Sequence, residues 1–405
     1  MTRLTRLAVS AVAVATLGAC REAAPSGAFA VRDSSGVQIV SNPATVRGDS
    51  GCVAVDTVPA LTIGGADAEG PYDLLRVFGA LRLADGGVAV LNAGTSELRF
   101  FDSTVRHSRT FGRAGAGPGE FRSPVGLLWF GRDTLMVHDI TTKRITLLSP
   151  AGALLETIGL QGIFGPGLLG RFDDGSFAYS VGSLYRPRAQ TGRRRDPAYL
   201  VRASRDGAEL DTLGSFPGWE SFVESDAQSV MATSAPFGRR TSFAVADGRV
   251  FVADNAEYRV RVYADGRRLE RIIERAHEPV ALTPARIERE KKRQRALGST
   301  SPQWLELLER MYQRDQPPAT LPAYGDIAVD ADGWLWVRAY LSAEDGSVGW
   351  DVFDATGRLR CALTLQSALF VREIGHDFLL GVLKDADGVE QVRLYGLRRS
   401  AQAPS

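Results

Sequence analysis

Chemically reactive residues are scarce in this chain. Only 4 histidines and 3 cysteines occur among 405 residues. Neither the H-E-x-x-H nor the C-x-x-C spacing of metal and redox sites is present, and no Gly-x-Ser-x-Gly segment forms a nucleophile elbow. The sequence thus offers no motif of hydrolytic or redox catalysis, so whether the protein is an enzyme stays open, with a non-enzyme favoured and no cofactor expected.

An excess of charge of one sign is also missing. The chain has 48 lysines and arginines against 47 aspartates and glutamates. A protein that binds nucleic acid usually carries a basic excess or a basic stripe, so we expect no nucleic-acid partner. After residue 19 no apolar run approaches the roughly 20 residues that a helix needs to cross a bilayer.

The first twenty residues have the pattern of a targeting segment. Arg3 and Arg6 precede a short apolar run, which ends in the tetrapeptide Leu17-Gly18-Ala19-Cys20. This tetrapeptide matches the bacterial lipobox, in which the cysteine thiol takes a diacylglycerol and the chain is cut just before it. We therefore predict a signal peptide over 1–19 and lipidation of Cys20 with palmitate-type chains, followed by a tether over 20–31. Since Arg21 is not the aspartate of inner-membrane retention, the outer membrane of the cell envelope is favoured, with the protein facing the periplasm or the surface.

A four-strand unit repeats through the rest of the chain. Each unit contains short β-branched and aromatic runs, and tight turns such as Asp85-Gly86-Gly87 and Ala331-Asp332-Gly333 separate the strands. The sixth unit has only three evident strands, and segment 51–65 precedes the first unit. We predict an all-β, six-bladed β-propeller over 32–398, whose ring segment 51–65 closes by pairing with the last blade, and a tail over 399–405. Segment 36–42 is expected to pack near the closing strand.

Four stretches of this repeat carry a resemblance to a known family: "DSSGVQIVSNP", "FGRAGAGPGEF", "VADNAEYRVRVYADG" and "YGDIAVDADGWLWVRAY". They resemble NHL-repeat and TolB-like six-bladed propellers, notably bacterial lipoproteins of this kind. The resemblance implies the fold over most of the chain but says little about function, because propellers serve many functions.

The two remaining cysteines are a candidate disulfide. Cys52 begins the predicted closing strand, and Cys361 lies in the outer strand of the fifth blade. These blades are neighbours, which permits a disulfide without requiring one, and two buried free thiols are the alternative.

The glycine-rich segment 111–124 could be taken for a phosphate-binding loop. Such a loop follows a strand and opens a helix, whereas this segment leads into another strand and contains Pro118 and Pro124. We interpret it as a connector between blades.

The long insertions of the repeat all fall at equivalent ends of the strands. They span 111–124, 181–198, 214–240, 276–325 and 341–349, and we call the end of the molecule where they meet the insertion-rich face. Thr283-Pro284 and Ser301-Pro302 predict the starts of two helices in an insertion over about 283–316. We expect the apolar stripe Trp304, Leu307, Leu308, Met311 and Tyr312 to pack on the propeller, and the Arg286–Arg295 run and Arg193–Arg195 to be solvated.

The insertion-rich face suggests a binding module, and a rival reading is a metal-dependent hydrolase or lyase. In the first reading a monomer is held on the membrane by its lipid and binds an unknown protein or glycan partner through this face. In the second, six-bladed propellers that are lactonases or lyases hold a metal at the axial channel. Asn92, Asp139 and Asp254 follow second strands at equivalent points. We expect them to initiate loops and expect no metal site, and a calcium or zinc site formed by these three residues is the alternative.

Overall fold

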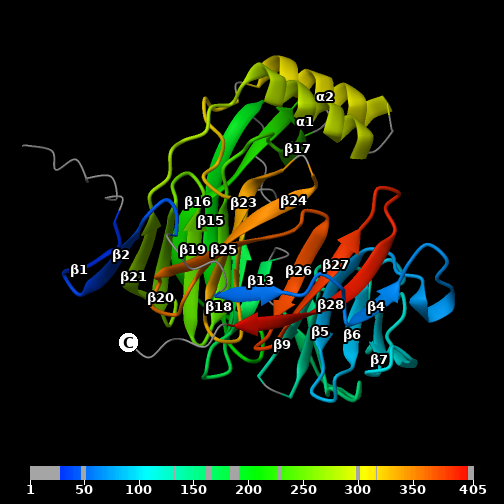
Figure 1. Cartoon of the computed structure of the whole chain (residues 1–405). Coiled ribbons are helices and arrows are strands. Elements are labelled where there is room, and N and C mark those ends of the chain that lie inside the picture. The colour runs from blue at the N-terminus through cyan, green and yellow to red at the C-terminus, as the bar shows by residue number, and fades with distance from the viewer. Residues whose placement is uncertain are drawn as a thin grey trace, which may run out of the picture.

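Six β-sheets and one pair of helices form the structure, a computed structural model (Figure 1). It describes residues 28–46, 52–131, 133–160, 167–182, 191–225, 230–297, 302–315, 317–343 and 345–399. The targeting segment, Cys20 and most of the tether lie outside these residues, as does the tail beyond 399. Among the described residues no helix has the length and apolar character to span a bilayer.

The first two sheets each contain four consecutive antiparallel strands. The first holds β5 (Val77–Arg82), β6 (Val88–Asn92), β7 (Glu97–Phe101) and β8 (His107–Phe111). The second holds β9 (Pro124–Trp129), β10 (Leu135–Asp139), β11 (Arg144–Leu148) and β12 (Leu154–Gly159). Both follow the predicted repeat strand by strand.

The third sheet is longer than the sequence predicts. It holds β13 (Gly167–Arg171), β14 (Phe177–Val181), β15 (Gly192–Ala203), β16 (Glu209–Ser225) and β17 (Val230–Ser234). Much of insertions 181–198 and 214–240, expected as loops, is therefore strand. The expectation of a solvated loop at Arg193–Arg195 was wrong, because these residues pair with Glu220–Phe222 and Val223 lies opposite Gly192.

The fourth sheet includes the hairpin formed by the first two described strands of the chain. It holds β18 (Thr241–Ala246), β19 (Arg249–Asp254), β20 (Arg259–Ala264) and β21 (Arg268–Arg275), followed by β2 (Val37–Asn42) and β1 (Ala30–Ser34). β2 runs parallel to β21, so the expectation that 36–42 packs near the closing segment 51–65 was wrong. The buried Asn42 explains this position, because its amide donates to the carbonyls of Glu274 and Gly357 at 3.0 Å each and so joins the fourth sheet to the fifth.

The last two sheets include the predicted closing segment. The fifth holds β22 (Ile327–Val329), β23 (Leu335–Ser342), β24 (Ser347–Phe353) and β25 (Leu359–Gln366). The sixth holds β26 (Leu369–Ile374), β27 (Phe378–Lys384) and β28 (Glu390–Arg399), with β3 (Val53–Val55) and β4 (Leu61–Gly64). Both β3 and β4 pair antiparallel with β28, as predicted for 51–65, and a 3-10 turn (Gly70–Tyr72) leads on to the first sheet.

The first strands of the sheets face one another, and apolar side chains fill the space between successive sheets. β5 contacts β9, β13 contacts β18, β18 contacts β22, and β26 contacts β5. One buried cluster, for example, joins Leu91 of the first sheet to Val137 of the second, and another joins Phe251 of the fourth to Val337 of the fifth. Such radial stacking of twisted sheets is the arrangement of a β-propeller.

The predicted glycine-containing tight turns occur between strands as expected. Gly207, in the turn between β15 and β16, has φ of +87°, and a Cβ there would lie 2.4 Å from the carbonyl oxygen of Gly159 in the second sheet. Glycine is thus required by backbone conformation and by close packing of neighbouring sheets.

The glycine-rich segment 111–124 connects two sheets, as predicted. β8 ends at Phe111 and β9 begins at Pro124, with no helix between them. The Arg144 guanidinium donates to the carbonyls of Ala116 and Gly117 at 3.1 and 3.0 Å, so the carbonyl groups of this segment bind a cation of the chain itself.

Two helices form the predicted insertion. α1 (Pro284–Leu297) and α2 (Pro302–Arg314) begin at the expected prolines. Leu307, Leu308 and Met311 are buried, and the last two pack against Phe222 of β16 and Ala235. The apolar stripe of α2 therefore packs on the extended third sheet.

Candidate functional site

The third sheet and the two helices form the most extended part of the insertion-rich face. β15 and β16 rise above the neighbouring strands, and α1 and α2 lie across their ends beside β17 (Figure 1). A pocket of about 300 Å³, which we call the insertion pocket, opens among these elements. One wall comes from β16 and residues 234–240, a second from α1, and a third from the end of β23.

A buried ion-pair network joins the sheet wall of the pocket to the end of α2. The Arg193 guanidinium of β15 lies 2.7 Å from Glu220 of β16 and 2.7 Å from Asp315, the residue after α2. It also donates to the carbonyl of Pro236 at 2.8 Å. The side chains of Glu220 and Asp315 are only 12% and 3% exposed, so this arginine is satisfied and holds the helices on the sheet.

Arg240 forms a fixed part of the pocket floor. Its guanidinium donates to the carbonyl of Gly325 at 3.0 Å and lies 3.1 Å from the Asp326 carboxylate. It also stacks on the Trp219 ring, with its central carbon 5.6 Å from the ring centroid. The Trp219 side chain remains 44% exposed at the pocket rim. Its ring is thus available to pack against a bound molecule.

Arg338 lines the pocket from β23 without a partner of its own. Among the described residues, its half-buried guanidinium makes no hydrogen bond and no ion pair, although its main-chain groups bond to Gly325 and Asp326. Burial lowers the pKa of Arg338, the Asp326 carboxylate opposes that shift, and Arg240 adds to it. An anion in the pocket would supply the missing partner.

Two hydroxyl groups also face the insertion pocket. Tyr340 follows Arg338 by two residues on β23, and burial raises its pKa to about 12, so the phenol stays a hydrogen-bond donor at neutral pH. Ser234 ends β17 and is exposed. Within the described part of the chain neither hydroxyl has a protein partner.

The pocket carboxylates are already paired. Glu220 accepts from Arg193 and from the main-chain N–H of Arg239 at 3.1 Å. Glu290 of α1 pairs with Arg293 at 2.5 Å and accepts from Gln294 at 2.9 Å. The pocket therefore offers cationic groups and hydroxyls to a ligand, and its acids serve the protein.

The structure does not bring the candidate metal ligands together. Asn92, Asp139 and Asp254 end the second strands of the first, second and fourth sheets. No group of three or more His, Cys, Asp or Glu side chains in the described ranges could hold a metal ion.

Asn92 and Asp139 instead organise the loops beside their own strands, and Asp254 joins the fourth sheet to the third. The Asp139 carboxylate accepts four main-chain N–H groups, from Arg122 and Ser123 at 2.6 and 3.0 Å and from Thr141 and Thr142 at 3.0 and 2.9 Å. Asn92 accepts from the Leu75 N–H at 2.7 Å. Asp254 pairs with Arg195 at 2.6 Å. The loop-organising interpretation therefore fits these contacts.

The histidines do not form a site either. His107 begins β8, His138 lies in β10, His277 follows β21, and His376 follows β26. His138 is 2% exposed, and burial lowers its pKa to about 4, so it is a neutral core residue. His376 is exposed and pairs with Asp332 at 2.6 Å.

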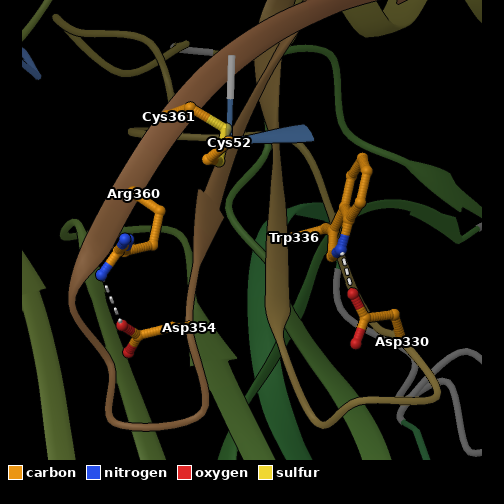
Figure 2. The surroundings of a disulfide bond; sticks show 6 residues. All are labelled: Cys52, Asp330, Trp336, Asp354, Arg360 and Cys361. Carbon is orange, nitrogen blue, oxygen red and sulfur yellow. Dashed lines mark hydrogen bonds and ion pairs between the residues drawn. A yellow bond between two sulfur atoms is a disulfide. The ribbon is translucent and has the colours of Figure 1, made fainter. Parts of the chain in front are cut away.

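Cys52 and Cys361 form a disulfide, one of the two alternatives that the sequence left open (Figure 2). The Cα atoms are 5.8 Å apart and the cysteines are separated by 309 residues in sequence. Cys52 precedes β3 and Cys361 lies in β25, so the bond joins the sixth sheet to the fifth. Nearby, the Trp336 indole donates to the buried Asp330 carboxylate at 2.7 Å (Figure 2).

Sequence reasoning missed the residues that define the pocket. Arg338 and Tyr340 belong to a predicted strand, where alternate residues of a half-buried sheet are ordinarily assigned to packing. Trp219 lies in a segment expected to be a loop. The available signal was a basic and an aromatic side chain at the end of a strand that borders long insertions.

No family model matches the chain, and no curated protein matches it by sequence. Structures of similar fold include a protein of Bacteroides fragilis inferred to be exported, at 10% identity and TM-score 0.49, covering 90% of this chain and 100% of that chain. A DUF4221 member from Bacteroides vulgatus has 9% identity and TM-score 0.49, covering 87% of this chain and 100% of that chain. Virginiamycin B lyase from Staphylococcus aureus has 8% identity and TM-score 0.37, covering 81% and 82%. These likenesses are remote.

Proposed function

We propose that the protein is a membrane-anchored extracytoplasmic binding module, which takes its ligand in the insertion pocket of a six-bladed propeller. The observation that carries the proposal is the pocket itself. Segments 214–240 and 276–325 interrupt the repeat at different places in the chain, yet they meet in one cavity, and a buried network at Arg193 fixes their relative position. Binding residues commonly lie on such insertions of a rigid scaffold.

The closed ring is part of this proposal. Its support is the pairing of β4 with β28 together with a buried cluster that joins Val90 of the first sheet to Val382 of the sixth. Between the fifth and sixth sheets, the Ala331 N–H donates to the Ile374 carbonyl at 3.0 Å. A ring leaves few strand edges exposed, which suits a rigid carrier of a binding face.

The anchor rests on the lipobox at Cys20. A multiply acylated cysteine would hold the propeller on a membrane of the envelope through a short tether, with the outer membrane favoured. Replacing Cys20 by serine should move the protein from the membrane fraction to the soluble fraction and abolish its labelling by a palmitate analogue. Unchanged membrane retention would contradict the anchor.

The rival metal-dependent hydrolase or lyase has no observation in its favour. Asn92, Asp139 and Asp254 belong to three sheets and are engaged in hydrogen bonds or an ion pair of the protein. Elemental analysis of the protein purified without added metal or chelator tests this rival directly. One equivalent of calcium or zinc that is lost on mutating Asp139 and Asp254 would revive it.

The experiment for the binding function is native mass spectrometry of the mature protein after incubation with the small-molecule fraction of cell-envelope extract. We expect a bound mass with the wild type and none with Ser234→Trp, which fills the pocket from an exposed position. Ser108→Trp is the matched control, because Ser108 is exposed and lines a different cavity, on the opposite face. Equal retention by all three proteins would place the ligand elsewhere, and no bound mass would contradict the proposed function.

A further inference from the structure

The insertion pocket has one positive charge that no other described residue pairs with. Four arginines line it, namely Arg239, Arg240, Arg293 and Arg338. Arg293 is paired with Glu290, Arg240 with Asp326, and Arg239 lies 3.9 Å from Glu220. Within the described residues Arg338 alone of these four has neither a hydrogen bond nor an ion pair for its guanidinium, so the pocket has room for one negative charge at that point.

We propose that the pocket binds a sugar acid, with the carboxylate on Arg338 and the sugar hydroxyls on Tyr340 and Ser234. This inference rests on the proposed binding function and specifies its ligand. A guanidinium presents a planar fork of N–H groups that matches a carboxylate in a bidentate pair. A phosphate monoester carries about −1.5 to −2 charges at neutral pH and would be matched less well by a single free guanidinium.

The remainder of the pocket suits a small, hydroxyl-rich molecule. The Tyr340 phenol and the Ser234 hydroxyl can each donate and accept, and neither is used by the protein within the described residues. The exposed Trp219 ring at the rim offers a flat apolar surface, against which the C–H face of a sugar ring can be buried. The volume of about 300 Å³ is at the lower end for ligand sites, which fits one sugar ring.

Isothermal titration of the mature protein in detergent with sodium glucuronate tests the proposal, with glucose, acetate and sulfate as comparison ligands at the same low ionic strength. We expect glucuronate to bind at least about tenfold more tightly than each comparison ligand. Arg338→Gln should weaken glucuronate binding about 10- to 100-fold, as expected for loss of a charge-assisted bidentate hydrogen bond. Tyr340→Phe and Ser234→Ala should each weaken it several-fold.

Arg109→Gln is the matched control for Arg338→Gln. Arg109 lines the cavity on the opposite face, where its guanidinium stacks on Phe100, so the same change there should leave glucuronate affinity unchanged. Circular dichroism and thermal unfolding of each variant confirm that a loss of binding is not a loss of fold.

The failures of this inference and of the proposed function can be told apart. If sulfate or acetate bind as tightly as glucuronate, or if glucose does and Arg338→Gln has no effect, the sugar-acid inference is wrong. If no sugar acid binds but the extract supplies a ligand that Ser234→Trp loses, the inference is wrong and the binding function stands. If neither glucuronate nor the extract gives a ligand, both are wrong.

Discussion

Glu373 is a buried carboxyl group at the meeting point of three sheets. It lies on β26, and its carboxyl oxygens accept from the Arg82 N–H of β5 at 2.7 Å and from the Trp129 indole of β9 at 3.1 Å. Burial raises its pKa to about 7, although both hydrogen bonds and the Arg82 charge oppose that shift. At this position burial has the larger effect.

The raised pKa of Glu373 predicts a pH dependence of stability. As pH rises from about 4.5 toward 7, the unfolded state releases this proton before the folded state does, so the free energy of unfolding falls. Glu373→Gln removes this pH dependence. The free energy of unfolding of the variant, relative to that of the wild type, should therefore rise by about 2–3 kcal/mol from pH 5 to pH 8. Urea unfolding of both proteins at the two pH values measures this gain, and parallel pH curves would contradict it.

Asp139 lies in the opposite situation, since its four N–H donors hold the carboxylate ionised. Burial raises its pKa, but the hydrogen bonds from Thr142, Arg122 and Ser123 outweigh burial and lower it. Its contribution to stability is therefore present above the ordinary pKa of about 4 and is lost as pH falls through the lower folded value.

Asp139→Ala should lower the free energy of unfolding by about 3 kcal/mol at pH 7, because it leaves main-chain N–H groups without acceptors. Calcium or a chelator should not change the wild-type value if the role of Asp139 is to organise its loop. Chemical denaturation with each addition measures this, and a calcium-dependent midpoint that Asp139→Ala abolishes would indicate a metal site.

At the scale of elements, the third sheet and α2 depend on each other. Met311 is 2% exposed and packs with Leu308 against Phe222. Met311→Ala should therefore reduce the free energy that docks the helices on the third sheet by about 2–5 kcal/mol. Leu305→Ala on the same helix is the control, because Leu305 is 37% exposed and its truncation should have little effect.

The rate of limited proteolysis within 283–325 measures how firmly the helices are docked. We expect faster cleavage for Met311→Ala and, because α1 carries one wall of the insertion pocket, a weaker affinity for any pocket ligand. Equal cleavage rates for the two variants would show that α2 is held by other contacts, such as the Arg193–Asp315 pair.

The apolar stripe of α2 and the strand repeat could be predicted because their signals are local. A period of 3.6 residues or of 2 residues, with glycine and proline at the ends, is readable within one segment. The extension of β15 and β16 could not be predicted in this way. Arg193 in the extended part of β15 is held by Asp315, which is 122 residues away in sequence, and no local sequence pattern predicts that contact.

At the scale of the whole molecule, the disulfide links Cys52, the residue before β3 of the sixth sheet, to Cys361 in β25 of the fifth sheet. Cys52 and Cys361 are 7% and 2% exposed, and the bond closes a loop of 309 residues. A disulfide of this kind stabilises a fold mainly by restricting the unfolded chain, typically by about 2–5 kcal/mol.

Cys361→Ser should therefore lower the free energy of unfolding by about 2–5 kcal/mol, with the fold retained. Denaturation of wild type and variant, each with and without reductant, measures the loss. Reductant should lower the midpoint of the wild type and leave that of the variant unchanged. Identical midpoints for oxidised wild type and Cys361→Ser would contradict a stabilising role.

The sequence by itself determined the repeated strands, the turns, the two helices and the pairing of segment 51–65 with the last sheet, but not the extension of β15 and β16. Each of these predicted features depends on periodicity, on turn residues or on a missing member of a repeat. Only the tertiary structure decided that β2 joins the fourth sheet, that Asn92, Asp139 and Asp254 serve separate loops, and that Arg338 lies in a pocket with Arg240 and Tyr340. Those outcomes depend on contacts between residues far apart in the chain. Whether a charge is paired is a property of the folded neighbourhood, which composition and spacing do not contain.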